Sequence, residues 1–312
     1  MALSIKQLTG KKVKGGEIIS RFLQAEGVTK VFGICDGTYF GTLATLGDYG
    51  IDVVGPRHEA CAVHAAGAYS AMTGELGVCL ASNGPGVANA ISGVAVENAE
   101  GHRVLLITSC RREPIVYPDR GGTYQCFPHT DVTRPMTKWS CTVRSVDRIA
   151  ELTRRALRYA YTGRPGVVHL DVPEDLVNAE VPVDPSWFRE PSEYRVTQAM
   201  DPSEGQVERA AAMIRAAKRP LIHAGCGVLH ADAAAELREV AEFTCSAVTT
   251  SWGARAVIDE RNDHVVPMIY MDTVNRARRE ADLVLVVGSR LGETDWWGKP
   301  PYWGHADEQK LI

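Results

Sequence analysis

The feature that most constrains the fold is a repeated alternation of short apolar runs with amphipathic stretches. Continuous runs rich in β-branched residues stand at 30–34, 51–55, 77–82, 103–109 and 166–172. Such runs are typical of strands covered on both faces. Helical patterns at 15–26, 59–73, 86–97 and 146–161 separate them. Because parallel strands need a crossover between them, the alternation predicts an α/β domain built on a doubly wound parallel sheet.

A stretch rich in Pro, Ser and charged residues divides the chain at 182–203, and this composition is typical of an exposed linker. Strand-like runs then return at 219–227, 245–251 and 282–290, with helical patterns at 231–243 and 271–280. We therefore expect a first domain over 1–181, a linker over 182–203 and a second, Rossmann-like parallel-sheet domain over 204–312. Because 307–312 resemble the start of a further strand, we expect the second domain to be incomplete at its C-terminal end or completed by another chain.

The bulk composition excludes several classes of protein. The 312 residues carry a net charge of −4 with Lys and Arg dispersed, which argues against nucleic acid as the main partner. The first residues lack a signal-peptide core, and no apolar segment reaches the roughly 18 residues of a membrane span, so a cytoplasmic protein without membrane contact is expected. The eight cysteines include no Cys-x-x-Cys pair and indicate free, mostly buried thiols rather than a metal cluster.

Two local features suggest a binding site, although each has a structural explanation when taken alone. The run "ASNGPGVANAISG" (81–93) follows a predicted strand, so its glycines allow close backbone approach at a helix start. Alone, it reads as a tight strand-to-helix turn. Arg57, His58 and Glu59 stand at the mouth of an Ala-rich helix. A carboxylate there is explained by the helix macrodipole, which stabilises it by about 0.3–1 kcal/mol.

Together, these features resemble a known family. The run "RHEACAVHAAGAYSAMTGELGVCLASNGPGVANAISGVAVENAE" is similar, in order and spacing, to the pyrimidine-binding domain of thiamine-diphosphate enzymes of the acetolactate synthase family. The segments "GGEIISRFLQAEGVTKVFGI", "RPMTKWSCTV" and "GRPGVVHLDVPED" fit the same pattern. The segments "KRPLIHAGCGV", "AVTTSWGARAV" and "ADLVLVVGSR" resemble the family's central domain. The resemblance thus covers essentially the whole chain.

The resemblance implies a catalytic role for Glu59. In this family the matching glutamate hydrogen-bonds N1′ of the cofactor's aminopyrimidine and favours the imino tautomer, whose nitrogen then removes the thiazolium C2 proton. To donate that bond, Glu59 must carry or share a proton. Three further residues, Pro85, Gly86 and Asn89, match the family's turn beside thiamine diphosphate. Gln125 matches a glutamine near the reacting carbon, although Cys126 stands where that family usually has an acid.

The resemblance also implies which ligands this chain holds and which it does not. Segments at the predicted strand ends match those that hold FAD or ADP in relatives, and their candidate residues are Gly225, Gly227, Thr250, Ser251, Gly288 and Arg290. The family binds the diphosphate and Mg²⁺ through a "GDG" motif on a third domain, and this motif does not occur here. No metal ligand is therefore expected in this chain, which would be the N-terminal part, or one subunit, of a split enzyme.

The function implied is thiamine-diphosphate-dependent C–C bond cleavage and formation, by acetolactate synthase-like decarboxylation of a 2-oxo acid and carboligation. A 2-hydroxyacyl-CoA lyase or oxalyl-CoA decarboxylase, acting on an acyl-CoA, is the nearest alternative. A non-catalytic nucleotide-binding or regulatory protein is an alternative from another class, against which Glu59 argues. We also expect a homodimer or homotetramer, with the small residues Ala62, Ala65, Ala66, Gly67 and Ala68 facing the second subunit.

Overall fold

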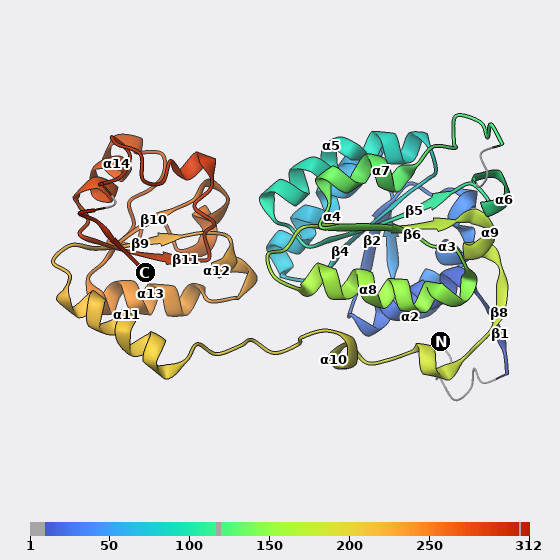
Figure 1. Ribbon diagram of the computed structural model, residues 1–312, viewed down its shortest axis with the longest axis horizontal. Coiled ribbons are helices and arrows are strands. Elements are labelled where there is room, and N and C mark those ends of the chain that lie inside the picture. Colours follow the sequence, from blue (N-terminus) through green and yellow to red (C-terminus); the bar gives the residue numbers. More distant parts are fainter. Residues whose placement is uncertain (1–9, 117–119, 306) are drawn as a thin grey trace. The chain divides into compact units, whose positions relative to one another are not determined.

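The structure, a computed structural model, describes residues 10–116, 120–305 and 307–312. The first nine residues, on which the expected absence of a leader partly rests, lie outside this part. Two compact units divide the chain, residues 1–198 and 199–312, called unit 1 and unit 2 below (Figure 1). Each unit contains its own parallel sheet with helices packed on it, so the predicted α/β class with two parallel-sheet domains is confirmed.

The main sheet of unit 1 has six parallel strands in the order β3-β2-β4-β5-β7-β6. They are β2 (Lys30–Gly33), β3 (Asp52–Val54), β4 (Gly77–Ala81), β5 (Val104–Cys110), β6 (Trp139–Thr142) and β7 (Val167–Pro173). The five predicted strands agree within two residues, whereas β6 was not predicted. The chain runs from β2 out to β3 and then returns to β4, so the strand order reverses between β2 and β4. In open α/β sheets, ligands bind at the carboxyl ends of strands beside such a reversal.

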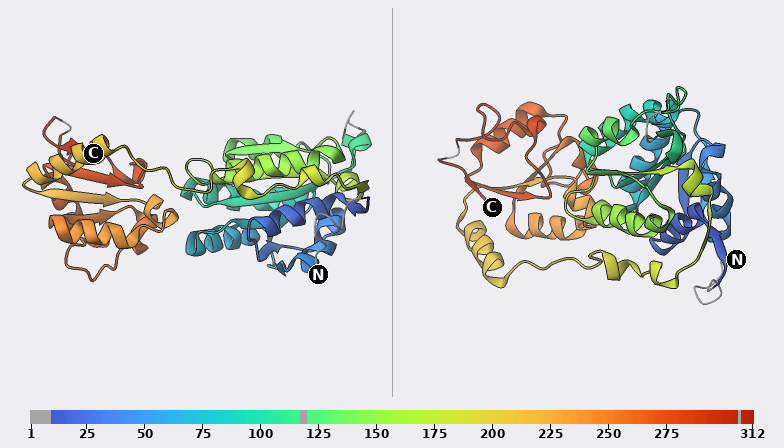
Figure 2. Two further views of the ribbon diagram at one scale, coloured as in Figure 1. Left: turned by 90° about the horizontal axis from the view of Figure 1, so that it is seen from below. Right: turned by 45° about the vertical axis from the view of Figure 1, so that its right-hand side comes forward.

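Helices cover both faces of this sheet (Figure 1). One face carries α2 (Gly15–Ala25), α3 (Phe40–Leu46) and α8 (Ile149–Tyr161), and it is turned to the viewer on the left of Figure 2. The other carries α4 (Glu59–Thr73) and α5 (Pro85–Glu100). Alternate residues of β4 divide between the two cores: Val78 packs with the first group and Cys79 with the second. Shorter helices are α6 (Glu113–Val116), α7 (His129–Thr133) and α9 (Glu174–Asn178).

Three of the small residues of α4 pack inside unit 1, whereas Ala65 is half-buried and Ala68 is exposed, so the contact with a second subunit stays a prediction for these two. Ala62, Ala66 and Gly67 are buried, and a Cβ at Gly67 would overlap the carboxylate of Glu97 on α5. That carboxylate accepts hydrogen bonds from Nδ1 of His64 (2.6 Å) and, on its other oxygen, Nδ1 of His102. The empty strip therefore makes room for a buried carboxylate of the same chain.

The segment that follows β7 is only partly exposed. A two-stranded antiparallel sheet pairs β8 (Glu180–Pro182) with β1 (Lys12–Lys14), and α10 (Pro191–Tyr194) comes next. Tyr194 is buried and its hydroxyl donates to Glu26 Oε1 at 2.5 Å, while Arg195 binds the same carboxylate. An uninterrupted exposed stretch begins only at Val196, although single residues before it are also exposed. The exposed stretch is therefore shorter than the 182–203 that composition suggested.

Unit 2 is built on four parallel strands in the order β10-β9-β11-β12. They are β9 (Pro220–Ala224), β10 (Ala247–Thr250), β11 (Leu283–Val287) and β12 (Lys310–Leu311), the last being the further strand expected near 307–312. The helices are α11 (Glu204–Ala216), α12 (Gly227–His230), α13 (Ala234–Thr244) and α14 (Met271–Glu280). The strand order reverses between β9 and β11, which gives unit 2 its own reversal point.

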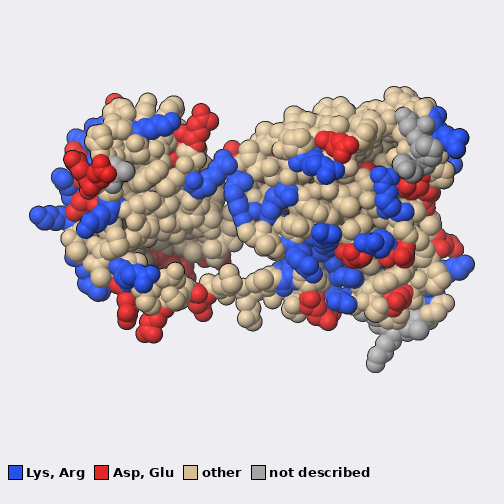
Figure 3. Space-filling model, viewed as in Figure 1, with Lys and Arg blue, Asp and Glu red and all other residues tan. Residues whose placement is uncertain are grey.

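The mixed surface charge agrees with what the sequence predicted, whereas the exposure of the cysteines does not. Basic and acidic side chains both occur on the face of each unit drawn in Figure 3. Among the described residues, none of the helices has both the length and the apolar character that crossing a membrane requires. Of the eight cysteines, Cys35, Cys61 and Cys245 are exposed, and only Cys79 and Cys110 are fully buried. The expectation that most thiols are buried was therefore wrong.

Candidate functional site

Glu59 is the first residue of α4, just beyond the carboxyl end of β3. His58 caps this helix, its Nδ1 accepting a hydrogen bond from the Ala60 amide at 3.1 Å. The cap sets where the helix begins and so fixes the direction in which Glu59 leaves it. Only 9% of Glu59 is exposed, and its Oε2 accepts a hydrogen bond from Nδ2 of Asn89 on α5 at 3.0 Å. Two residues singled out in the sequence are thus brought together from two helices.

The turn between β4 and α5 packs closely beside this carboxylate. A Cβ added to Gly86 would lie 3.4 Å from Oε1 of Glu59 and 2.5 Å from the hydroxyl of Ser82. Pro85 occupies the first position of α5, where its lack of an N–H costs nothing. The missing side chain at Gly86 therefore lets the start of α5 lie against Ser82 and Glu59 without a clash.

Gln125 reaches the same turn from the loop before α7. Its Nε2 donates to Oδ1 of Asn83 at 2.9 Å. Gly84 has φ of +62°, and a Cβ there would lie 2.5 Å from Cα of Gln125, so this loop presses directly on the turn. Asn83 is 1% exposed, and its Nδ2 is buried without a hydrogen-bond partner. Sequence reasoning missed Asn83, although its place between the strand and "GP" marks it as a turn residue.

The surroundings of Glu59 are apolar and disfavour further negative charge. Burial, and then the Glu59 carboxylate, raise the pKa of the Cys79 thiol. Burial also raises the pKa of the Tyr39 hydroxyl, with Asp36 and Glu59 adding to the shift. Both side chains therefore stay neutral at physiological pH. The loop after β2 is held in place beside them by Thr38, whose hydroxyl hydrogen-bonds Asp36 and Ser109, each at 2.5 Å.

These residues fit the aminopyrimidine end of thiamine diphosphate. A pyrimidine offers ring nitrogens and an exocyclic amine, and this turn offers the Glu59 carboxylate and the unpartnered Asn83 amide. The donor set does not resemble a site for Mg²⁺. Within residues 10–116, 120–305 and 307–312, no three His, Cys, Asp or Glu side chains are grouped so that they could hold a metal ion.

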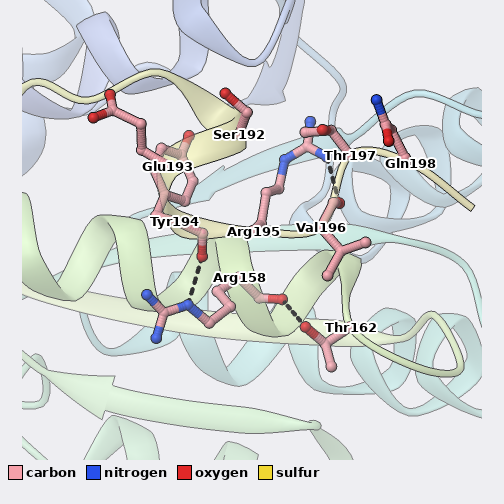
Figure 4. Close-up of a pocket in the computed structure, with 9 residues that line it drawn as sticks. All are labelled: Arg158, Thr162, Ser192, Glu193, Tyr194, Arg195, Val196, Thr197 and Gln198. Atoms are coloured by element: carbon pink, nitrogen blue, oxygen red, sulfur yellow. Dashed lines mark hydrogen bonds between the residues drawn. The ribbon is translucent and has the colours of Figure 1, made fainter. Parts of the chain in front are cut away.

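Two surface pockets of unit 1 lie apart from Glu59. One of about 400 Å³ opens between the loop after β2 and α9, with both Arg111 and Arg112 bound to Glu174. The other, about 560 Å³, lies where the C-terminal part of α8 meets α10 (Figure 4). There the Arg158 side chain donates from Nε to the carbonyl of Tyr194 at 2.6 Å. None of the residues singled out in the sequence lines either pocket.

The candidate nucleotide residues of unit 2 gather at the carboxyl edge of its sheet, but their glycines contact one another. A Cβ at Gly225 would lie 2.5 Å from the carbonyl oxygen of Gly288, and the Gly227 amide donates to that oxygen at 2.9 Å. Thr250 is buried, with its carbonyl 3.4 Å from Nη2 of Arg278. Ser251 is half-buried and Arg290 is exposed. Backbone packing thus accounts for these glycines.

Comparisons with known proteins agree with this geometry. Residues 13–132 match the family model described as "Thiamine pyrophosphate enzyme, N-terminal TPP binding domain", and residues 207–312 match "Thiamine pyrophosphate enzyme, central domain". The first match contains Glu59 and the turn before α5.

Individual relatives carry names from the same family. The chain is 31% identical over 288 residues to a probable acetolactate synthase large subunit of Methanocaldococcus jannaschii, covering 90% of this chain and 48% of the relative. It is 32% identical over 307 residues to the acetolactate synthase large subunit of Corynebacterium glutamicum, covering 95% and 48%. An acetolactate synthase isozyme 3 large subunit of Escherichia coli is 29% identical over 290 residues, covering 90% and 49%. The chain spans about half the length of these relatives. Because both of its domains match models of this family, the chain belongs to the thiamine pyrophosphate enzymes.

Proposed function

We propose that this chain holds the aminopyrimidine of thiamine diphosphate in an enzyme that breaks or forms a C–C bond beside a carbonyl, in the manner of an acetolactate synthase. One observation carries the proposal: the carboxylate of Glu59 is buried at the start of α4 and is held by Asn89 against the glycine turn before α5. The names of the relatives support a 2-oxo acid as substrate, with decarboxylation followed by carboligation.

Each residue of the turn has a stated task in this proposal. Glu59 holds a proton at the pyrimidine ring nitrogen, and Asn89 keeps the carboxylate pointed toward the turn by its bond to Oε2. Gly86 lets the start of α5 lie against Glu59, and Asn83 donates its unpartnered N–H to the ligand. Gln125 orients Asn83 from the opposite side. When bound, thiamine diphosphate supplies the nucleophilic carbon and the electron sink for decarboxylation.

The other end of the cofactor lies outside this proposal for the chain. The resemblance assigns the diphosphate and Mg²⁺ ligands to a third domain, so we propose that residues outside these 312 hold them, on the same polypeptide or on a partner subunit. We do not propose FAD or ADP as a ligand of this chain, because the glycines at the edge of unit 2 pack against one another's backbone. We do not propose nucleic acid as a partner either, because the chain carries a net charge of −4 and its Lys and Arg residues are dispersed.

Glu59→Gln in the assembled enzyme tests the proposal. Glutamine keeps the size of the side chain but cannot supply an acid at the ring nitrogen, so exchange of the cofactor's C2 proton, followed by NMR, should slow by about a hundredfold or more. Glu100→Gln, at the exposed end of α5, is the control and should exchange at the wild-type rate. Unchanged exchange in Glu59→Gln would remove this residue from the mechanism.

A further inference from the structure

Beneath the turn before α5 lies a chain of buried polar side chains to which the proposed function gives no task. Its members come from β5, β7 and the region of α7, and all are almost inaccessible to solvent: Thr108, His129, Thr133, His169 and Asp171. Burying so many polar groups is costly unless each finds a partner. Their hydrogen bonds form one continuous path that ends at the backbone of Gly84.

The end nearest the turn fixes the state of His129. The Gly84 amide donates to Nε2 of His129 at 3.1 Å, so Nε2 carries no proton. The proton is therefore on Nδ1, which donates to Oδ1 of Asp171 at 3.2 Å. Burial raises the pKa of Asp171, but the hydrogen bonds and charges around it outweigh burial and hold that pKa below its ordinary value. Asp171 is thus a carboxylate that accepts the His129 proton.

The hydrogen-bond directions at the far end of the path can be assigned in the same way. The Thr108 hydroxyl donates to Asp171 at 2.5 Å and lies 2.7 Å from Nε2 of His169, so this nitrogen must donate. Nδ1 of His169 then accepts from the Thr133 hydroxyl at 2.7 Å. Burial lowers the pKa of His169 to about 4, which agrees with a neutral ring. Thr108, His129 and His169 therefore each donate one hydrogen bond and accept one, whereas Asp171 only accepts.

Other contacts restrict the same backbone and ring. The ring of Phe127 meets that of His129 edge-on, with centroids 4.6 Å apart, and a hydrogen bond from Thr142 occupies the second oxygen of Asp171 at 3.1 Å. The backbone of Gln125 presses on Gly84 from outside. Gly84 is consequently held from two sides, by a hydrogen bond to His129 and by contact with Gln125.

We propose that His129 is a positioning residue for the cofactor turn, acting through Gly84. Its unprotonated Nε2 fixes the Gly84 amide and thereby the placement of Asn83 and Gly86 opposite Glu59. Asp171 keeps His129 in the required tautomer. The inference rests on the proposed function, because the value of a fixed turn lies in the pyrimidine it receives. Without an acceptor at this position, the Gly84 amide is left unpaired beneath the turn.

The test uses the 312-residue chain and two variants. His129→Gln keeps an acceptor that can reach the Gly84 amide, whereas His129→Leu removes it at similar bulk. Nitrogen-15 shifts of the wild-type rings report which nitrogen is protonated, and hydrogen exchange reports the Gly84 amide. We expect exchange at Gly84 to be faster by about tenfold in His129→Leu and close to wild type in His129→Gln, as one lost hydrogen bond implies.

Thiamine diphosphate, added at millimolar concentration and followed through the Gly86 amide signal, supplies the second readout. Its Kd should rise about tenfold in His129→Leu and much less in His129→Gln. A protonated Nε2 in the wild type, or equal exchange at Gly84 in all three proteins, would overturn the inference. If the wild type does not bind the cofactor, the proposed function fails, while the tautomer and the exchange rates still decide the role of His129. Should His129→Leu not fold, the wild-type tautomer and His129→Gln decide it.

Discussion

The carboxyl edges of the two sheets of this protein carry similar glycine-containing sequences, but their glycines make different contacts. In each, the strand order reverses beside the first strand of the βα series, and glycines follow the strands that flank the reversal. In unit 1, Gly86 lies against the side chains of Ser82 and Glu59. In unit 2, Gly225 and Gly227 meet the backbone of Gly288. A glycine at such an edge therefore predicts close approach, but only the structure shows what approaches it.

The buried polar groups of the two units differ in the same sense. In unit 1, the path from Gly84 through His129 to Asp171 is hydrogen-bonded at each step. In unit 2, Nε2 of His223 lies 3.4 Å from Oδ1 of Asp295, and both atoms lack a hydrogen-bond partner. Burial lowers the pKa of His223, as it does for His169. The continuous path of buried hydrogen bonds is thus found beneath the edge that holds the candidate site.

The largest expected effect is a loss of stability on filling the contact in unit 2. In Gly225→Ala the new methyl group would meet the backbone of Gly288 and Ser289, which cannot swing aside, so we expect unit 2 to lose about 3 kcal/mol. Urea unfolding, followed on NMR signals of unit 2, measures this. Gly205→Ala, in α11 with open space around it, is the control and should be neutral or slightly stabilising. Wild-type stability of Gly225→Ala would show that the glycine edge of unit 2 is open.

Acid should destabilise unit 1 through His169. Its pKa is lowered by burial from 6.5 to about 4, so the unfolded chain binds a proton in this range that the folded chain does not. Stability is therefore fully present above pH 6.5 and falls by about 3 kcal/mol as the pH approaches 4. Urea unfolding of unit 1 at several pH values measures the slope. His169→Val, less stable at neutral pH, should lose this part of the slope, whereas the exposed His305→Val should keep it; equal slopes in all three would contradict the assignment.

A smaller effect on stability separates the glycine of unit 1 from that of unit 2. The methyl group of Gly86→Ala would displace the Ser82 hydroxyl, which can rotate away, so we expect a cost of only about 1 kcal/mol. The same group occupies the space beside Glu59, and thiamine diphosphate should bind at least about tenfold more weakly. Calorimetry and urea unfolding measure the two effects. Gly47→Ala, with open space around it, should change neither; undiminished binding in Gly86→Ala would place the ligand elsewhere.

Periodicity predicted most of the fold because buried parallel strands and amphipathic helices leave plain patterns. The strand β6 was not predicted, because "WSCT" is short and mixes polar with apolar residues. It belongs to the sheet only through its pairing with β7. On α4, Gly67 was misread because composition cannot tell which partner covers a small residue, and Glu97 of the same chain does so. Glu59 and Asn89 could be found from their motif, whereas His129 and Asp171 are joined only by folding, 42 residues apart.

The most direct test is to map where thiamine diphosphate touches this chain. The amide signals of the 312-residue chain are recorded while the cofactor is added to millimolar concentration, first without and then with Mg²⁺. We expect the amide signals of Glu59, Gly86 and Asn89 to shift and those of Gly225 and Gly288 to stay in place. Binding should be weak and should depend little on Mg²⁺. Shifts centred on the glycines of unit 2, or tight binding that requires Mg²⁺, would contradict it.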